Sequence, residues 1–261
     1  MIDQHVHSRF SPDSKVEIEE YIKKAKENGS EYLNITDHFE CLDKLKKFDN
    51  FDYQKNMIMQ YEYIKNRSEN IYSGIEIGYN QGAKKNISNF LSRYDFSLIL
   101  LSVHDNDEEE VRYFKPVTYD RSIDEIVKLY FEQMYDAVTS GIDYDILSHV
   151  GFIFRYCKGQ VNPLNYIGEL ERIFKIIIKE SKILEINGGC FRRGTYDVYN
   201  FYREVLKLYK SLGGQKICLG SDSHKLDDYC GNFEDLIKFI KSNGFDELTL
   251  VKMRKHTQIK I

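Results

Sequence analysis

The chain has little of what marks membrane, secreted or fibrous proteins. Its 261 residues include no tryptophan and only three prolines. The longest apolar run, SLILLSV over residues 97–103, is far shorter than the ~20 residues that a membrane-spanning helix needs. No apolar signal segment precedes Asp3 and His5, and no Ser/Gly-rich linker divides the sequence. We therefore expect one domain over residues 1–261, located in the cytoplasm and without membrane contact.

A disulfide framework and a basic surface are also missing. The five cysteines form no CxxC pair and are odd in number, which favours reduced thiols. The formal net charge is −4, and no stripe of lysines and arginines interleaved with aromatic residues occurs. A nucleic-acid backbone would find no attracting field, so we expect no nucleic-acid partner. The composition gives no prediction of the oligomeric state.

Short apolar segments alternate with amphipathic segments along the whole chain. The expected strands are residues 2–6, 32–36, 71–77, 96–103, 144–147, 183–186 and 216–219. The expected helices are residues 16–28, 53–67, 83–94, 122–140, 163–181 and 198–212. This alternation predicts an α/β fold of parallel strands joined by helices, either a doubly wound sheet or a closed barrel. No glycine-rich phosphate loop follows any strand, which disfavours the doubly wound sheet.

Most of the histidines directly follow these apolar segments. Six of seven do so, with two carboxylates in similar places: His5, His7, His38, His104, His149, His224, Glu76 and Asp222. Parallel strands end at one face, so these side chains are expected to be neighbours. Singly, each histidine could be a core or capping residue and each carboxylate an ion-pair partner or helix cap. Together they predict a site, with His256 left as a surface residue.

The number and type of these side chains point to metal ions. His5 and His7, two residues apart, face the same side of a strand, and Asp13 follows them closely. Nine nitrogen and oxygen ligands exceed the needs of one tetrahedral ion. They suit two or three divalent ions sharing a bridging carboxylate, and the mixed ligation fits zinc, manganese or iron. Such clusters clamp a phosphoryl group and activate a bound water.

Six short motifs occur in one order along nearly the whole chain. They are HVH at 5–7 with Asp13, TDH at 36–38, GIEIG at 74–78, SVH at 102–104, LSH at 147–149 and GSDSH at 220–224. In this order they resemble the polymerase-and-histidinol-phosphatase (PHP) family of metallo-phosphoesterases. Within that family, the single-domain size and LEINGGCFRRG at 184–194 are most similar to the histidinol-phosphate phosphatases.

The resemblance implies a distorted seven-stranded (β/α)7 barrel with a trinuclear metal site at the C-terminal face of its strands. It implies three ligand sets that share Glu76: His5, His7, Glu76 and Asp222; Glu76, His104 and His149; and Asp13, His38 and His224. Two segments depart from parts of the family. SPDS at 11–14 stands where many members have CPHG, which adds negative charge to the metal site. NGGC at 187–190 replaces the typical NTSG, which leaves the substrate contacts of that loop open.

The activity implied by the resemblance is hydrolysis of histidinol phosphate to histidinol and phosphate in histidine biosynthesis. We expect a metal-bridging hydroxide to attack the phosphate monoester. Glu76, Asp222 and His224 are the expected catalytic residues, with Asp222 or a metal-bound water protonating the leaving oxygen. Guanidinium groups match phosphate geometry. The candidates for binding the phosphate of the substrate are Arg155, Arg192, Arg193 and Arg9. The alternative for each is that it is an ordinary surface arginine.

Other functions remain open at this point. A PHP-type phosphoesterase could act on nucleotides or other small phosphate esters, although the charge disfavours a long nucleic acid. An amidohydrolase-like barrel also uses an HxH pair, but it usually has a bridging carbamylated lysine where this chain has Glu76. A non-enzymatic metal-binding module would need no arginines.

Four further polar residues are candidates for the site, but each has a stronger alternative explanation. Glu40, Asp105 and Asp107 could recognise the amine and imidazole of histidinol, but each is better explained as a solvated loop charge. Cys190 could be a ligand or nucleophile, but no histidine outside the metal motifs is left to pair with it.

Overall fold

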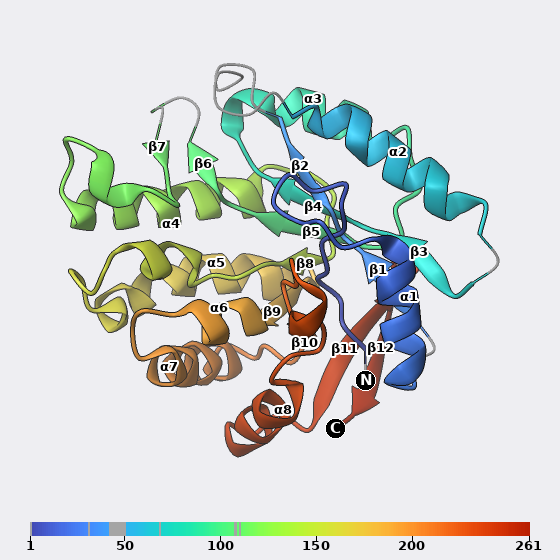
Figure 1. Ribbon diagram of the computed structural model, residues 1–261. Coiled ribbons are helices and arrows are strands. Elements are labelled where there is room, and N and C mark those ends of the chain that lie inside the picture. The colour runs from blue at the N-terminus through green and yellow to red at the C-terminus, as the bar shows by residue number, and fades with distance from the viewer. Residues whose placement is uncertain (1, 31, 42–50, 68, 107–108, 110) are drawn as a thin grey trace.

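Parallel strands surrounded by helices form the centre of the protein, as the computed structural model shows (Figure 1). It describes residues 2–30, 32–41, 51–67, 69–106, 109 and 111–261. The helices are α1 (Ile18–Glu27), α2 (Tyr53–Lys65), α3 (Lys84–Leu91), α4 (Ile123–Thr139), α5 (Ile167–Lys179), α6 (Gly188–Arg193), α7 (Val198–Ser211) and α8 (Phe233–Ser242). Short 3₁₀ helices are η1 (Gln81–Ala83), η2 (Pro116–Thr118), η3 (Phe152–Tyr156), η4 (Pro163–Tyr166) and η5 (Leu226–Asp228).

The main sheet contains six parallel strands in the order β10-β9-β8-β5-β4-β2. They are β2 (His38–Glu40), β4 (Ile75–Gly78), β5 (Ile99–Ser102), β8 (Ile146–Leu147), β9 (Ile183–Asn187) and β10 (Ile217–Gly220). A parallel pair, β1 (Leu33–Ile35) with β3 (Ile71–Ser73), precedes β2 and β4 along the same two segments of chain. The predicted α/β fold with parallel strands is confirmed.

The N-terminal segment closes the sheet into a barrel. The amide of Gln4 donates to the carbonyl of Leu219 at 3.3 Å, and the carbonyl of His5 accepts from the amide of Asp222 at 2.8 Å. On the other side, the amide of Thr36 donates to the carbonyl of Val6 at 2.8 Å. Residues 2–7 therefore lie between β10 and β1, where they join the two edges of the sheet.

This closing segment is less regular than predicted. Residues 2–6 were expected to form a strand, but only an isolated parallel bridge between Val6 and Ser223 occurs there. Side chains take the places of ladder partners: Asp3 Oδ1 accepts from the amides of His5 and Ser221, and Thr36 Oγ1 accepts from the amide of Val6. The barrel is distorted because side-chain acceptors replace backbone acceptors at its seam.

The interruption between β3 and β4 has a steric cause. The chain bends between β3 and β4 at Gly74, where a Cβ would lie 2.7 Å from the methyl group of Thr36. Glycine is therefore required where the two segments pass closest. Beyond this bend the register pairs His38 with Glu76, so two predicted site residues lie side by side on β2 and β4.

The helices fall close to the predicted segments because their sequences carry both periodicity and caps. In α4, Ser122 and Glu125 form a reciprocal capping box at the N-terminus. Ile126, Tyr130 and Met134 of the same helix are buried, at the spacing of one helical face. No helix in the described part of the chain combines the length and the apolar character needed to cross a membrane.

The C-terminal hairpin was not predicted. Strands β11 (Glu247–Lys252) and β12 (Lys255–Lys260) pair antiparallel. A further small antiparallel pair joins β6 (Asp105–Asn106) to β7 (Val111–Arg112), where a solvated loop was expected. The C-terminal hairpin lies at the N-terminal ends of the barrel strands: Arg254 donates its amide to Ser97 before β5, and its guanidinium to Asp145 before β8. The hairpin therefore lies at the end of the barrel opposite the C-terminal ends of the strands.

Candidate metal centre

All nine predicted ligands meet at the C-terminal end of the barrel. They come from the closing segment and the loop after it, from β2 and β4, and from the loops after β5, β8 and β10: His5, His7, Asp13, His38, Glu76, His104, His149, Asp222 and His224. Four overlapping groups of histidines and carboxylates have ligand atoms within 4.8 Å of one another. The sequence prediction that these residues are neighbours agrees with this geometry.

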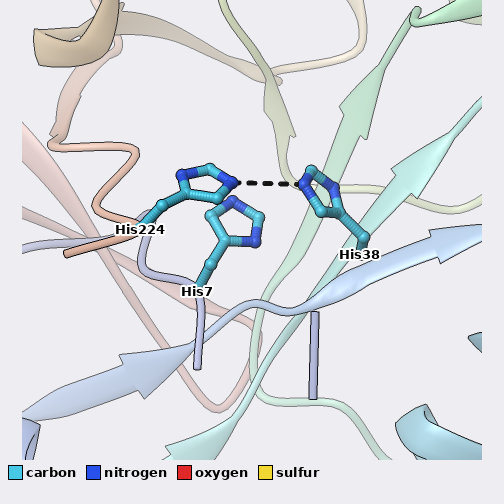
Figure 2. A group of neighbouring side chains, drawn as sticks. All are labelled: His7, His38 and His224. Carbon is cyan, nitrogen blue, oxygen red and sulfur yellow. Dashed lines mark hydrogen bonds between the residues drawn. The ribbon is translucent and has the colours of Figure 1, made fainter. Parts of the chain in front are cut away.

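Three histidines from distant parts of the chain stack at one edge of the cluster (Figure 2). The ring of His7 lies 4.1 Å, centroid to centroid, from both His38 and His224. The Nε2 atoms of His38 and His224 are 3.4 Å apart. Asp13 approaches the same two atoms, with Oδ2 3.1 Å from His224 Nε2 and Oδ1 3.6 Å from His38 Nε2. Asp13 therefore lies beside the two histidines with which it was predicted to share an ion.

Glu76 is the central carboxylate and is completely buried. It faces five histidines with its two oxygens: Oε1 lies 2.8 Å from His149, 3.4 Å from His5 and 3.6 Å from His104, and Oε2 lies 2.7 Å from His38 and 3.4 Å from His7. Burial alone would raise the pKa of Glu76, but His5, His38 and His104 hold it well below its usual range. An ionised carboxylate in this position can bridge two cations.

Asp222 is the second buried carboxylate of the cluster. Its Oδ1 lies 3.6 Å from His7 Nε2 and 3.5 Å from His224 Nδ1. Its Oδ2 faces away from the histidines and accepts from Arg193 Nη2 at 2.6 Å and from Arg155 Nη2 at 3.5 Å. Burial alone would raise the pKa of Asp222, but Arg193 and the nearby histidines hold it well below its usual range.

Hydrogen bonds outside the cluster orient several of the imidazoles. His5 Nδ1 donates to Glu185 at 2.7 Å, His104 Nδ1 donates to Glu40 at 2.7 Å, and His224 Nδ1 donates to the carbonyl of Asp222 at 3.1 Å. In each ring this leaves Nε2 as the nitrogen that faces the cluster. Such outer partners fix the ring and the tautomer of a ligating histidine.

Two of these orienting groups were missed as part of the metal centre. Glu185 lies in the segment LEINGGCFRRG at 184–194 and carries the same signal as Glu76, a charged residue inside an apolar strand. Glu40 was considered for the substrate, but its carboxylate is engaged by His104. A further series of hydrogen bonds orients His7: the Ser11 hydroxyl lies 3.1 Å from His7 Nδ1 and donates to Asp37 at 2.6 Å.

The cluster fits divalent cations on the evidence of its own polar atoms. His149 Nδ1 is buried without a hydrogen-bond partner among the described residues, and the 2.7 Å ion pair of His38 Nδ1 with Glu76 Oε2 lacks hydrogen-bond geometry. Buried polar atoms of this kind carry a large free-energy cost unless another group satisfies them. The Coulomb attraction of the carboxylates raises the pKa of His38 and of His104 despite their burial, so the site demands positive charge. Cations bound to these nitrogen and oxygen atoms would meet that demand.

A cavity of about 370 Å³ opens beside the cluster. Its lining combines ligand candidates with aromatic and basic side chains: Pro12, Asp13, His38, Glu40, Tyr53, His104, Asp105, Arg112, Phe114, His149, Phe152, Arg155, Tyr156, Arg193, Asp222 and His224. Arg112 was not among the predicted arginines because its neighbours in sequence give no ligand motif. Asp105 lines the cavity, whereas Asp107 lies outside the described residues.

The four predicted arginines divide into two pairs. Arg155 and Arg193 line the cavity, and Arg155 is buried, with its guanidinium 5.1 Å from the Phe152 ring. Arg192 and Arg9 do not line it. Arg192 donates to the carbonyl of Ser221 at 2.6 Å and pairs with Asp228 at 3.3 Å, while the half-exposed Arg9 pairs with Glu17 at 2.7 Å. Arg192 and Arg9 therefore make their contacts outside the lining of the cavity.

Cys190 lies near this arginine pair but does not face the cavity. It is buried, and its Sγ lies 3.4 Å from Arg155 Nη2. Among the described residues no histidine nitrogen forms a hydrogen bond with this Sγ, so the geometry offers no base for a cysteine nucleophile.

Comparisons with known proteins agree on one family. The model of the PHP domain matches residues 3–189. A probable histidinol-phosphatase of Clostridium acetobutylicum is 29% identical over 93% of each chain, and one of Thermotoga maritima is 26% identical over 96% of this chain and 95% of its own. The solved structure of histidinol phosphate phosphatase from Lactococcus lactis, complexed with zinc, L-histidinol and phosphate, superposes with a TM-score of 0.80 at 24% identity over 98% of each chain. It shows the same fold.

Proposed function

Because the chain belongs to the PHP domain family, we propose that it is a metal-dependent phosphatase that hydrolyses histidinol phosphate to histidinol and phosphate. The observation that carries this proposal is the meeting of nine nitrogen- and oxygen-bearing side chains beside a cavity that also contains Arg155 and Arg193. Relatives that cover nearly the whole chain are described as histidinol-phosphatases, which supports the choice of substrate.

We propose that two to three divalent ions bind in the cluster, as zinc, manganese or iron. The ligand sets would be His5, His7, Glu76 and Asp222; Glu76, His104 and His149; and Asp13, His38 and His224. When bound, such ions neutralise phosphoryl oxygens and lower the pKa of a coordinated water. The central position of Glu76 between five imidazoles supports its role as the bridging carboxylate.

Arg155 and Arg193 would hold the phosphate. Their guanidinium groups meet at Asp222 Oδ2, so both are aimed at the point where the cavity reaches the metal ligands. A guanidinium fork pairs with two phosphate oxygens at once. Arg155 is buried in this position, whereas Arg193 is partly exposed.

Asp222 serves better as a ligand than as the proton donor to the leaving oxygen. The two arginines and the surrounding histidines lower its pKa and keep it ionised. A proton donor would need a raised pKa. Of the two donors considered from the sequence, this favours the water over the carboxylate.

The side chains that line the cavity suit a small substrate with an aromatic ring and a positively charged group. Its volume of about 370 Å³ is in the range of small-molecule sites. Phe114, Phe152 and Tyr156 provide flat apolar surfaces against which an imidazole ring can pack, and Asp105 also lines the cavity. A polymeric substrate would need a longer groove.

The experiment is a metal analysis combined with phosphate release. The purified protein, loaded in turn with zinc, manganese and iron, is offered histidinol phosphate, nucleoside monophosphates and sugar phosphates. We expect at least two metal ions per chain and the highest kcat/KM for histidinol phosphate. Equal rates for all esters would contradict the substrate while leaving a general PHP phosphoesterase, and fewer than two ions per chain would contradict the metal centre.

A further inference from the structure

Glu185 is a carboxylate inside the barrel that belongs to none of the proposed ligand sets. It lies on β9 and is fully buried. A charge in such a place is expensive unless several donors meet it. Three donors do so here, and they come from different walls of the barrel.

The two oxygens of Glu185 contact different parts of the metal centre. Oε1 accepts from His5 Nδ1 at 2.7 Å. Oε2 accepts from the backbone amide of His149 at 2.8 Å and from Asn187 Nδ2 at 3.0 Å. His5 and His149 belong to different proposed ligand sets, and their Nε2 atoms both face Glu76 Oε1, at 3.4 and 2.8 Å.

The surrounding backbone reserves space for this carboxylate. A Cβ at Gly220 would lie 2.1 Å from Glu185 Oε1 and 2.5 Å from the Cβ of His5. Any larger residue at position 220 of β10 would therefore disrupt the contact between Glu185 and His5. Asn187 is fixed as well, because its Oδ1 accepts from the amide of Cys190 at 2.9 Å and so its Nδ2 must face Glu185.

We propose that Glu185 is a positioning residue that sets the ligand geometry of two metal ions at once. It fixes the tautomer of His5, so that Nε2 faces the cluster, and it holds the chain that carries His149 at the end of β8. This inference rests on the proposed metal centre. Through these two contacts, Glu185 determines the distance between the ion bound by His5 and the ion bound by His149.

A single amide substitution disturbs this arrangement without changing side-chain volume. In Glu185→Gln one oxygen becomes an NH₂ group. If this NH₂ group points toward His149, it faces two other donors, the His149 amide and Asn187 Nδ2, and both hydrogen bonds are lost. Turned toward His5, it forces the proton of that ring onto Nε2, which can then no longer ligate. Both orientations weaken metal binding, and the loss of such outer partners costs about 10- to 100-fold in affinity.

The test measures metal affinity directly. Metal-free wild-type protein and Glu185→Gln are titrated with zinc in competition with a coloured chelator, and cobalt(II) absorption reports ligand geometry. The control is Glu180→Gln, which removes the same charge from an exposed position just before β9. We expect two ions to bind at least tenfold more weakly in Glu185→Gln, with a changed cobalt spectrum, and no change in Glu180→Gln.

A double variant separates positioning from general destabilisation. If Glu185 acts through His5, adding Glu185→Gln to His5→Ala weakens the ion of the His5 set little beyond His5→Ala alone. Additive losses at that ion, unchanged affinities in Glu185→Gln, or a variant that stays unfolded at saturating zinc would each overturn the inference. Wild-type protein that binds no metal would overturn the proposed function, whereas metal-binding wild type with an unaffected Glu185→Gln overturns only the inference.

Discussion

The Nε2 atoms of His5 and His7 lie 3.0 Å apart in the fully buried interior of the barrel. Both face carboxylate oxygens of Glu76, at 3.4 Å in each case. Two ring nitrogens and a carboxylate converge in this way when a positive charge can lie among them. The pairing is a direct result of the HxH spacing on a segment that is pinned from both sides by backbone hydrogen bonds.

Removal of bound metal should lower thermal stability. Ligand atoms that converge in the native state are dispersed in the unfolded chain, so metal binds mainly the folded form. At a free zinc concentration about 1,000 times Kd the stabilisation is ~4 kcal/mol, which corresponds to roughly 8–16 °C in Tm for a domain of about this size. Calorimetry with zinc and with a strong chelator measures it, and coinciding Tm values would speak against the metal centre.

His38→Ala should abolish one metal site and most of the activity. His38 contacts both Glu76 and Asp13, so its loss affects the third ligand set and the bridging carboxylate. We expect kcat to fall at least about 100-fold, since removing a ligand costs more than removing the partner of a ligand. His256→Ala is the matched control, because His256 lies beside Asp145 at the opposite end of the barrel. Similar effects in both variants would contradict the assignment.

Arg155→Met should impair phosphate binding while preserving the packing of the arginine stem. A hydrogen bond to a charged group is worth roughly 1.5–3 kcal/mol, so kcat/KM should fall about 10- to 150-fold. Arg203→Ala, on the exposed side of α7, should stay within about twofold of wild type. Inhibition by inorganic phosphate provides a second measurement: an unchanged inhibition constant in Arg155→Met would remove this residue from the phosphate site.

Two glycine substitutions should change stability in opposite directions. In Gly220→Ala the new Cβ meets Glu185 and His5, and overpacking of this kind costs about 1–3 kcal/mol. Gly168 lies near the start of α5 with no atom within 4 Å of an added Cβ. Gly168→Ala should therefore stabilise by up to ~1 kcal/mol. Denaturant unfolding of both variants checks the pair, and a harmless Gly220→Ala would show that the seam has room to spare.

The Cys157 thiol should resist alkylation in mildly alkaline solution. Burial raises its pKa to about 12, compared with about 8.5 for a free cysteine. The unfolded chain therefore ionises this thiol from about pH 8.5, but the native state only near 12. As pH rises through this window, the thiol's contribution to stability is lost. Iodoacetamide at pH 9 followed by mass spectrometry should modify Cys157 only after denaturation, and rapid labelling in the native state would contradict its burial.

The sequence predicted which side chains gather at this site better than it predicted the strands that carry them. Histidines at the ends of apolar runs identify their positions because parallel strands must end at one face. The seam at residues 2–7 could not be predicted, because its irregularity arises from contacts of Asp3 and Thr36 with residues elsewhere in the chain. Pattern alone cannot reveal which side chain will replace a ladder partner.

The arginines illustrate a second limit. Arg155, Arg192 and Arg193 all follow strands, but only the fold reveals that Ser221 and Asp228 hold Arg192 away from the cavity. Arg112 reaches the cavity from a small β pair that has no apolar signal of its own. Side-chain direction in a loop depends on the nearest acceptor, which is a tertiary property.

The seam of the barrel also sets the order in which the protein can be completed during synthesis. Asp3 Oδ1 accepts from the amide of Ser221, 218 positions along the chain. At ribosomal speeds of about 5–20 residues per second, the first residues wait roughly 10–40 s for that partner. Contacts of such long range also fold slowly. A nascent chain that stalls before β10 lacks Asp222 and His224, so it cannot assemble the complete proposed centre.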